Sequence, residues 1–148
     1  MTGEAPLLHK VVAYIVRDAT LVVFTHAEDQ DSIVEPGLQV PAGTRSDRES
    51  GPEAVLREAR EETGLDGLTV VRFLGEAQYD MRPYATAVHA REFYQLGVEG
   101  EVPEHWQHVE RDGGHGEPRP FNLRWLPVKQ AHVLAAGQGA MLGQIDRA

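Results

Sequence analysis

Three carboxylates lie within a short acidic stretch, residues 57–62, which reads REAREE. Because a helix turns by about 100° per residue, Glu58, Glu61 and Glu62 would share one arc of a helix surface. Carboxylate oxygens are the ligands that hard divalent cations prefer, and a cation held in this way commonly binds phosphate. An acidic cluster alone is equally typical of a solvated helix surface. The surrounding residues therefore have to decide between the two interpretations.

The acidic stretch lies in a segment that carries the start and stop signals of a helix. Ser50 and Glu53 have the spacing of a capping box, and Pro52 stands in the first turn, where its missing N–H does no harm. Gly64 is a C-terminal stop, so we expect a helix from Ser50 to about Thr63. The residues expected to face the core are Val55, Leu56, Ala59 and Thr63.

The rest of the chain alternates short apolar segments with polar ones. Strands are expected at residues 11–16, 21–24, 38–40, 68–76, 85–96 and 122–126, with the first two forming a hairpin. Helical segments are expected at residues 128–136 and 140–146, and the polar stretch 97–120 is interpreted as one long loop. This order of elements predicts an α/β sandwich.

The bulk composition indicates one soluble domain spanning residues 1–148. The chain is 41% hydrophobic and 25% charged, and its N-terminus lacks the pattern of a signal peptide. No apolar stretch approaches the roughly 20 residues that span a bilayer, so no membrane association is expected. The sequence contains no Cys. This excludes disulfides and thiolate metal sites, and favours a cytoplasmic location.

The formal net charge of −9 limits the classes of partner. Duplex nucleic acid is not expected to bind, because the phosphate backbone requires a basic surface. A small polyphosphate would also be repelled unless metal ions neutralised its site.

The residues around the acidic stretch match a longer pattern, G-x5-E-x7-R-E-U-x-E-E-x-G-U, where U is aliphatic. Its specified positions are Gly43, Glu49, Arg57, Glu58, Glu61, Glu62, Gly64 and Leu65. This pattern is the signature of the Nudix hydrolases, and the chain resembles that family at each of these positions. The resemblance implies a single-domain α/β/α sandwich with a central mixed sheet.

The resemblance also implies roles for the residues of the box. Glu61 and Glu62 would be the principal ligands of Mg²⁺ or Mn²⁺, with Glu58 as a third ligand or as the group that orients an attacking water. Arg57 and Glu49 would form an ion pair that holds the loop against the helix. All five side chains would thus serve one loop–helix site.

Two glycines and one carbonyl complete the expected site. Gly43 would permit a tight turn at the entry to the helix, and Gly64 would end the helix. A backbone carbonyl, that of Ala42 or of Gly43, would add an oxygen ligand to the metal. Many family members have Gly where this chain has Ala42, but a carbonyl ligand needs no particular side chain.

The reaction that the resemblance implies is attack by water on one phosphorus of a nucleoside diphosphate linked to another moiety, X. The general base is expected outside the box, on the stretch interpreted as a long loop. Its candidates are Glu104, Glu110, His115 and Glu117. Glu117 is favoured because it precedes the strand that leads to Trp125, although each candidate is equally typical of a surface residue.

Substrate contacts are harder to derive from the sequence. Tyr79, Arg82 and Trp106 are candidates, because aromatic and guanidinium groups stack on bases and bind phosphate. His105 and His108 flank Trp106, but no further ligand completes a metal site with them. We expect a small-molecule diphosphate of nucleotide type as the partner, and a homodimer is compatible with the sequence.

Two other functions remain open on the sequence. A protein of this fold could bind a nucleotide or sugar phosphate without cleaving it, although the intact box argues against this. An isomerase acting on an isoprenoid diphosphate usually requires a reactive Cys, which this chain lacks. The box recognises the diphosphate and not X, so the substrate itself is not determined.

Overall fold

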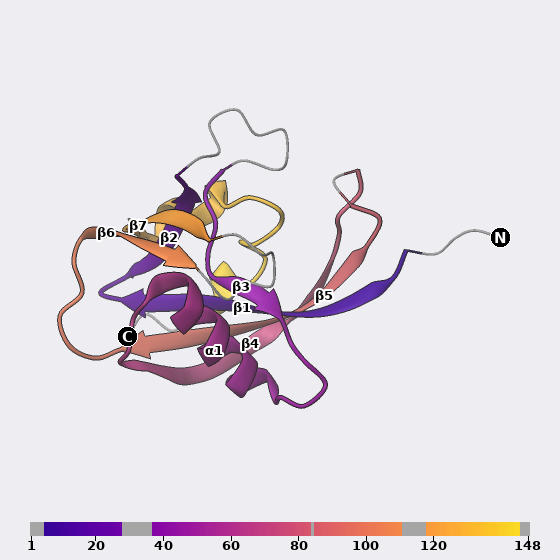
Figure 1. The fold of residues 1–148 in the computed structure, drawn as a ribbon, viewed down its shortest axis with the longest axis horizontal. Coiled ribbons are helices and arrows are strands. Elements are labelled where there is room, and N and C mark those ends of the chain that lie inside the picture. The colour runs from indigo at the N-terminus through magenta and orange to yellow at the C-terminus, as the bar shows by residue number, and fades with distance from the viewer. Residues whose placement is uncertain (1–4, 28–36, 84, 111–117, 146–148) are drawn as a thin grey trace.

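A computed structural model describes residues 5–27, 37–83, 85–110 and 118–145 of the chain (Figure 1). Its strands are β1 (Leu7–Arg17), β2 (Thr20–His26), β3 (Ala42–Thr44), β4 (Leu68–Asp80), β5 (Val88–Val98), β6 (His105–Glu110) and β7 (Arg119–Pro127). The helical elements are α1 (Gly51–Thr63) and two short 3₁₀ segments, η2 (Val128–Val133) and η3 (Leu142–Gln144).

The strands form one sheet in the order β4-β5-β1-β2-β7-β6, with β3 paired to β1 beside this path. Strands β1 and β5 run parallel, whereas the other pairs are antiparallel. The sheet is therefore mixed, which confirms the predicted α/β fold with a central mixed sheet. None of the helices in the described part of the chain combines the length and the apolar character that crossing a membrane requires.

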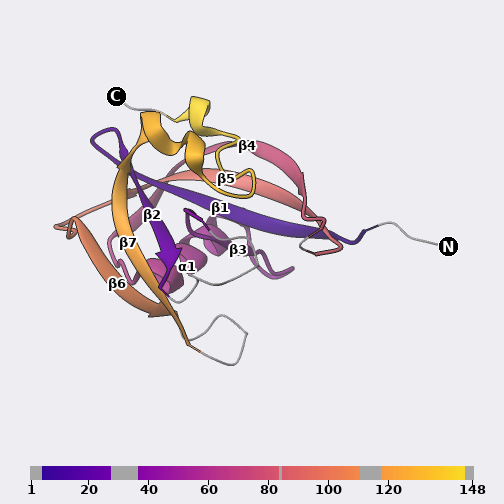
Figure 2. The same cartoon turned by 90° about the horizontal axis from the view of Figure 1, so that it is seen from above.

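Strand β1 is central because both of its faces are buried. Val11, Ala13 and Ile15 face α1 and pack with it. Val12 and Tyr14 lie on the opposite face of the sheet and pack with the C-terminal segments. A strand buried on both faces reads as a continuous apolar run, as residues 11–15 do. Figure 2 shows the result: α1 lies on one side of β1 and β5, and the C-terminal 3₁₀ segments lie on the other.

Strands β1 and β2 separate soon after the turn that joins them. Their ladder contains only two residue pairs, Val16 with Leu21 and Arg17 with Thr20. Farther along β1, residues 10–12 pair with β3 instead. Strand β2 continues along β7, and the two curve away from β1 (Figure 2). A cavity lined by residues of β1, β2 and β3 lies at this divergence.

The strand predicted at residues 38–40 is wrong. Gln39 makes only an isolated bridge with Phe24, and the strand β3 begins later, at Ala42. Pro41 explains the offset, because it has no N–H to give to a ladder. Its carbonyl accepts a hydrogen bond from the N–H of Ala13 (2.8 Å), and the regular pairing with β1 starts one residue later.

The single long loop predicted for residues 97–120 is also wrong. Strand β6 lies within it and pairs with β7 from His105 opposite Arg124 to Glu110 opposite Arg119. The strand is rich in polar residues, and so it lacks the apolar alternation of a half-buried strand. It forms because β7 and the end of α1 supply its partners.

The two C-terminal helices are shorter and tighter than predicted. Residues 128–133 and 142–144 form 3₁₀ segments, and Leu134 is already extended. Ala136 and Gly137 have positive φ angles of 54° and 72°, which no continuous α-helix contains. The segments cover the face of the sheet opposite α1 with Ala131, Leu134 and other apolar residues.

Candidate functional site

Helix α1 has the ends that the sequence predicts. The Ser50 hydroxyl accepts from the N–H of Glu53 (3.2 Å), and the Glu53 carboxylate accepts from the N–H of Ser50 (2.9 Å). Gly64 adopts a left-handed conformation (φ 75°) and donates its N–H to the carbonyl of Arg60 (2.8 Å). Both ends of the helix are thus fixed, and its side chains have defined positions relative to the sheet.

Glu62 is the most buried carboxylate of the box, with 6% of its surface exposed. Its Oε1 accepts a hydrogen bond from the N–H of Ala42 (3.0 Å), at the start of β3. Burial raises the pKa of Glu62 well above its usual range, and the hydrogen bond from Ala42 opposes this only in part. A carboxylate placed here favours a proton or a bound cation over a free charge.

Glu58 lies against the backbone of β3, and this contact explains the glycine at position 43. A Cβ on Gly43 would lie 2.1 Å from the carboxylate carbon of Glu58, closer than any real contact. Burial raises the pKa of Glu58, although its ion pair with Arg57 (Nη1–Oε1 2.9 Å) lowers it in part. The glycine thus lets a largely buried carboxylate approach the strand directly.

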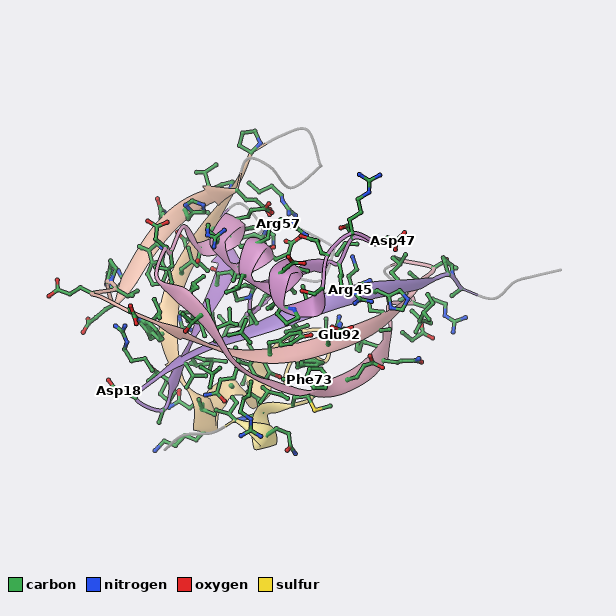
Figure 3. The ribbon with its side chains drawn as sticks, turned by 90° about the horizontal axis from the view of Figure 1, so that it is seen from below. Asp18, Arg45, Asp47, Arg57, Phe73 and Glu92 are labelled. Carbon is green, nitrogen blue, oxygen red and sulfur yellow. The ribbon has the colours of Figure 1, made fainter. Side chains whose placement is uncertain are left out.

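Arg57 connects the helix to the loop that precedes it. Its Nε and Nη2 donate to the two carboxylate oxygens of Glu49 (2.6 and 2.9 Å), and Nη2 also donates to the carbonyl of Thr44 (3.0 Å). The hydrogen bond with Arg57 lowers the pKa of Glu49 to about 2. In the same loop, Arg45 faces Glu92 of β5 (Figure 3), at 3.7 Å between Nη1 and Oε2. These bonds fix the loop over the helix.

Glu61 is the most exposed of the three helix carboxylates. It faces Arg57 at the i,i+4 spacing, with Nη1 3.4 Å from its Oε2. Arg57 therefore contacts both Glu58 and Glu61 through the same nitrogen. Glu61 lies at the solvent side of the box, and Glu58 and Glu62 lie at its buried side.

Glu110, a carboxylate outside the box, lies beside Glu58 and Glu62. Glu110, the last residue of β6, is only 2% exposed and pairs with Arg119 of β7 (2.5 Å). One carboxylate oxygen from each of Glu58, Glu62 and Glu110 lies within 4.8 Å of the others. Like charges at this spacing repel one another strongly when they are buried. An all-oxygen set of this kind suits a hard divalent cation such as Mg²⁺ or Mn²⁺.

Two side chains of β6 attach this strand to the C-terminal end of α1. The indole Nε1 of Trp106 donates to the carbonyl of Thr63 (2.9 Å), and Nε2 of His108 lies 3.0 Å from the carbonyl of Glu61. The last carbonyls of a helix have no partners within the helix, so both contacts satisfy otherwise unpaired groups. They also set the position of Glu110, which lies on the same strand.

A cavity of about 410 Å³ lies beside the carboxylates, where β1 and β2 separate. Its wall includes Glu62 and Gly43 on the carboxylate side and Phe24 and Phe121 from β2 and β7. Its basic residues are Lys10, His26, His89, Arg91 and Arg119. The cavity has the volume of a small-molecule site and opens next to the carboxylate cluster.

The predicted substrate-binding residues lie in three different surroundings. The indole N–H of Trp106 is hydrogen-bonded to α1. Tyr79 packs against Arg91, and the Cζ of Arg91 lies 4.6 Å from the centroid of the Tyr79 ring. Arg82 is exposed and pairs with Asp80. None of the three is among the described residues that line the cavity.

The predicted general bases also lie in different surroundings. Glu104 is exposed just before β6, and Glu110 is buried in the carboxylate cluster. Glu117 and His115 lie outside the described residues. The sequence favours Glu117 for its position before the strand that leads to Trp125, and it does not predict the strand β6 that carries Glu110. The alternation of Trp106, His108 and Glu110 was the available signal, since it puts all three on one face.

Comparison with known proteins identifies the family. The model of the NUDIX domain matches residues 7–144. The chain therefore belongs to the NUDIX domain family. Members of this family cleave pyrophosphate bonds in nucleoside diphosphate derivatives, so the chain is a Nudix hydrolase by class. A comparison with curated protein sequences gave no match.

Solved structures share the fold at low sequence identity. The MutT protein from Methanosarcina mazei Go1 superposes with a TM-score of 0.68 at 18% identity, over 99% of this chain and 97% of that one. A MutT NUDIX hydrolase from Burkholderia pseudomallei gives 0.67 at 18%, over 95% and 98%. The E. coli ORF135 protein gives 0.62 at 20%, over 95% and 89%. At these identities the likeness concerns the fold.

Proposed function

We propose that this chain is a metal-dependent pyrophosphohydrolase that cleaves the diphosphate of a nucleoside diphosphate linked to another moiety, X. The observation that carries the proposal is the convergence of Glu58, Glu62 and Glu110 beside a cavity of small-molecule size. A small anionic substrate and an acidic protein repel one another, so a cation between them is required for binding. The substrate is a small molecule, since neither a membrane nor duplex nucleic acid suits this charge.

The proposed cation is Mg²⁺ or Mn²⁺. Glu58, Glu62 and Glu110 would hold it, with Glu61 reaching it or a second ion from the solvent side. The carbonyl of Ala42 or Gly43 remains a proposed ligand, and Ala42 already positions Glu62 through its N–H. When bound, the ion supplies charge neutralisation on the phosphate oxygens and lowers the pKa of bound water.

The chain's own residues position these groups before the substrate arrives. Arg57 and Glu49 hold the loop over α1, so that Gly43 stays against the carboxylate of Glu58. Arg119 holds Glu110 through a charge-assisted hydrogen bond. A site whose groups are already in place loses little free energy in reorganisation when the substrate binds.

For the proton acceptor, Glu117 stays our proposal from the sequence, and Glu110 is the alternative among the described residues. Replacing each with Gln separates them. Loss of the base should lower kcat and alter its pH profile while the affinity for Mn²⁺ is kept. Loss of a metal ligand should weaken the affinity for Mn²⁺ itself.

The function is tested by product identification. The protein is incubated with nucleoside diphosphate compounds in the presence of Mg²⁺ or Mn²⁺, and the products are separated and identified. Glu61→Gln and Glu62→Gln should lower turnover roughly 100-fold or more, whereas the exposed Glu101→Gln should not. Full activity in both box variants contradicts the proposal. Binding without products supports the non-catalytic alternative.

Two further proposals concern the setting of the enzyme. The absence of Cys supports a cytoplasmic location, because small secreted domains are commonly stabilised by disulfides and this chain has none. A homodimer is the proposed assembly, and light scattering of the purified protein measures its mass directly.

A further inference from the structure

Residues 39–42, here called the crossing segment, span the place where β1 and β2 separate. At its start, Gln39 exchanges two backbone hydrogen bonds with Phe24 of β2 (2.8 and 2.9 Å). At its end, the N–H of Ala42 donates to Oε1 of Glu62 on α1 (3.0 Å). The position of this segment therefore determines where the most buried carboxylate of the box meets its backbone partner.

Val40, in the middle of the crossing segment, belongs to neither neighbouring ladder. Gln39 makes the bridge to β2, and the regular pairing with β1 begins at Ala42. Val40 is fully buried, so water cannot satisfy its N–H. The N–H donates instead to Oε1 of Gln138, at 2.8 Å and 98 residues farther along the chain. A side chain thus takes the place of a strand partner at this point.

Gln138 is itself held at its backbone as well as at its side chain. Its N–H donates to the carbonyl of Ala135 (3.0 Å), and its carbonyl accepts from the hydroxyl of Tyr14 on β1. The residue is buried, with 6% of its surface exposed. Because the Val40 N–H requires an acceptor, the amide oxygen of Gln138 and not its nitrogen faces it. The orientation of the amide group is therefore determined.

The bond between Gln138 and Val40 connects elements on the two faces of the sheet. Gln138 lies between η2 and η3, and these segments cover the face opposite α1 (Figure 2). On the side of α1, Ala42 donates to Glu62. Pro41 joins the two halves of the crossing segment, and its ring fixes a φ angle between them, so a shift of Val40 is passed on to Ala42.

Resting on the proposed hydrolase function, we propose that Gln138 is a positioning residue of the metal site, which acts on Glu62 through the crossing segment. In this role it needs no contact with the cation. Side chains that orient the ligands of a metal commonly change its affinity by tenfold or more when they are replaced. The crossing segment also carries the carbonyl of Ala42, a proposed ligand, so two oxygen donors depend on the same bond. A bond that served only the stability of the C-terminal segments would leave the affinity for the metal unchanged.

Calorimetric titration with Mn²⁺ tests the proposal. The variant Gln138→Met keeps an unbranched side chain of similar length and removes the oxygen that accepts from the Val40 N–H. Its affinity for Mn²⁺ should be about tenfold lower. Ile145→Ala is the matched control, because Ile145 is buried on the same face of the sheet and its side chain forms no hydrogen bond. The control should also lower the thermal midpoint, but it should leave the affinity for Mn²⁺ unchanged.

A second measurement needs no metal. In the metal-free protein, the amide proton of Ala42 is deshielded by its hydrogen bond to Glu62, so its NMR chemical shift reports the length of that bond. Gln138→Met should move this resonance upfield, whereas Ile145→Ala should leave it in place. If only the amide resonance of Val40 moved, the effect of Gln138 would end at its direct partner, and the proposal would be wrong.

The outcomes separate this proposal from the proposed function. If the unmodified protein binds Mn²⁺, an equal affinity in Gln138→Met overturns the positioning role, whether or not any diphosphate is cleaved. If the unmodified protein binds no Mn²⁺, the proposed function fails, and the Ala42 resonance alone decides whether Gln138 positions Glu62. If Gln138→Met does not fold, Gln138→Asn, which draws the amide back by one methylene, takes its place in both measurements.

Discussion

The contact between Gly43 and Glu58 illustrates how single residues position this site. A carboxylate reaches the buried side of the box only because the opposite strand has no Cβ at that position. Glu62 reaches the same region through the N–H of Ala42. Strand β3 is just three residues long, yet it positions two carboxylates of the helix, the half-buried Glu58 and the buried Glu62.

Replacing Gly43 with Ala should therefore damage the site. The added Cβ would overlap the Glu58 carboxylate, so either the side chain or the strand must move. The Glu58 carboxylate is the end of a flexible side chain and can turn aside, so we expect little change in the free energy of unfolding, whereas kcat/KM should fall roughly 100-fold because the carboxylate is displaced. Gly143→Ala is the control, because its Cβ would meet nothing within 4 Å. Equal activity of the two variants would contradict the assigned role of Gly43.

The raised pKa of Glu62 predicts how the stability of the metal-free protein depends on pH. Burial raises its pKa, so the folded chain holds this proton more tightly than the unfolded chain does. The tighter binding of this proton in the folded chain contributes fully to stability below the ordinary pKa of Glu, about 4.3. The contribution is lost as the pH rises through the raised pKa of Glu62. Glu62→Gln stays neutral and keeps an acceptor for the Ala42 N–H.

In the presence of a chelator, Glu62→Gln should thus be more stable than the unmodified protein at pH 8. The difference should narrow toward pH 5. Urea unfolding across this pH range measures it, and activity with Mg²⁺ should be lost in the same variant. If both proteins showed the same pH dependence, the buried side chain at position 62 would not be the source of the effect.

At the scale of elements, the loop before α1 depends on one ion pair. Arg57 lowers the pKa of Glu49 to about 2, so the carboxylate stays charged in the folded protein at pH values where it is protonated in the unfolded chain. The stabilisation is full above pH 5 and is lost as the pH falls toward 2. Glu49→Gln should cost about 1 kcal/mol at pH 7, since the pair is partly exposed.

Denaturant midpoints measured between pH 3 and pH 7 check this expectation. The gap between Glu49→Gln and the unmodified protein should shrink as the solution becomes more acidic. Glu101→Gln, at an exposed position, should show no such gap. A gap that stayed constant down to pH 3 would assign the effect to lost packing and not to charge.

Local signals explain why α1 was predictable from the sequence and β6 was not. The capping residues Ser50 and Glu53 and the stop at Gly64 act within a few residues, so the sequence states them directly. Strand β6 is stabilised by β7 and by the carbonyls at the end of α1, and the partner of Trp106 on α1, Thr63, lies 43 residues earlier in the sequence. The carboxylates of the box were therefore found, whereas the position of Glu110 required the tertiary structure.

The attachment of β6 to α1 predicts a role for Trp106 in metal affinity. Trp106→Phe removes the N–H that the Thr63 carbonyl accepts, and should lower stability by about 1 kcal/mol. Because β6 carries Glu110, the affinity for Mn²⁺ should fall several-fold as well. Trp125→Phe loses an indole bond of similar length, to the carbonyl of Pro103 (3.1 Å), which does not involve α1.

Calorimetric titration with Mn²⁺ compares the two tryptophan variants. The expected result is weaker binding in Trp106→Phe and unchanged binding in Trp125→Phe at a similar loss of stability. Equal affinities in the two variants would show that the indole of Trp106 stabilises the fold without positioning Glu110.

At the scale of the whole molecule, the site lies where the sheet divides. Strand β1 pairs with β5 along most of its length, whereas its pairing with β2 ends after two residue pairs. The separation leaves room for a cavity between the two parts of the sheet. Helix α1 brings Glu62 to its wall, and strands β1 and β5 bring Lys10 and Arg91 to the same wall. The topology thus places acidic and basic side chains around one cavity.

This arrangement predicts that divalent cations stabilise the whole fold. Three carboxylates, two of them buried and one half-buried, repel one another in the metal-free protein, and binding to the folded state alone adds stability by mass action. At 100 times its dissociation constant, Mg²⁺ should add about 2.7 kcal/mol, which for a chain of this size raises Tm by roughly 5–11 °C. KCl at matched ionic strength separates this effect from general screening of the −9 charge, and Glu62→Gln removes the site. An equal rise in Tm with KCl, or an undiminished rise in Glu62→Gln, would assign the stabilisation to the acidic surface as a whole and not to the cluster formed by Glu58, Glu62 and Glu110.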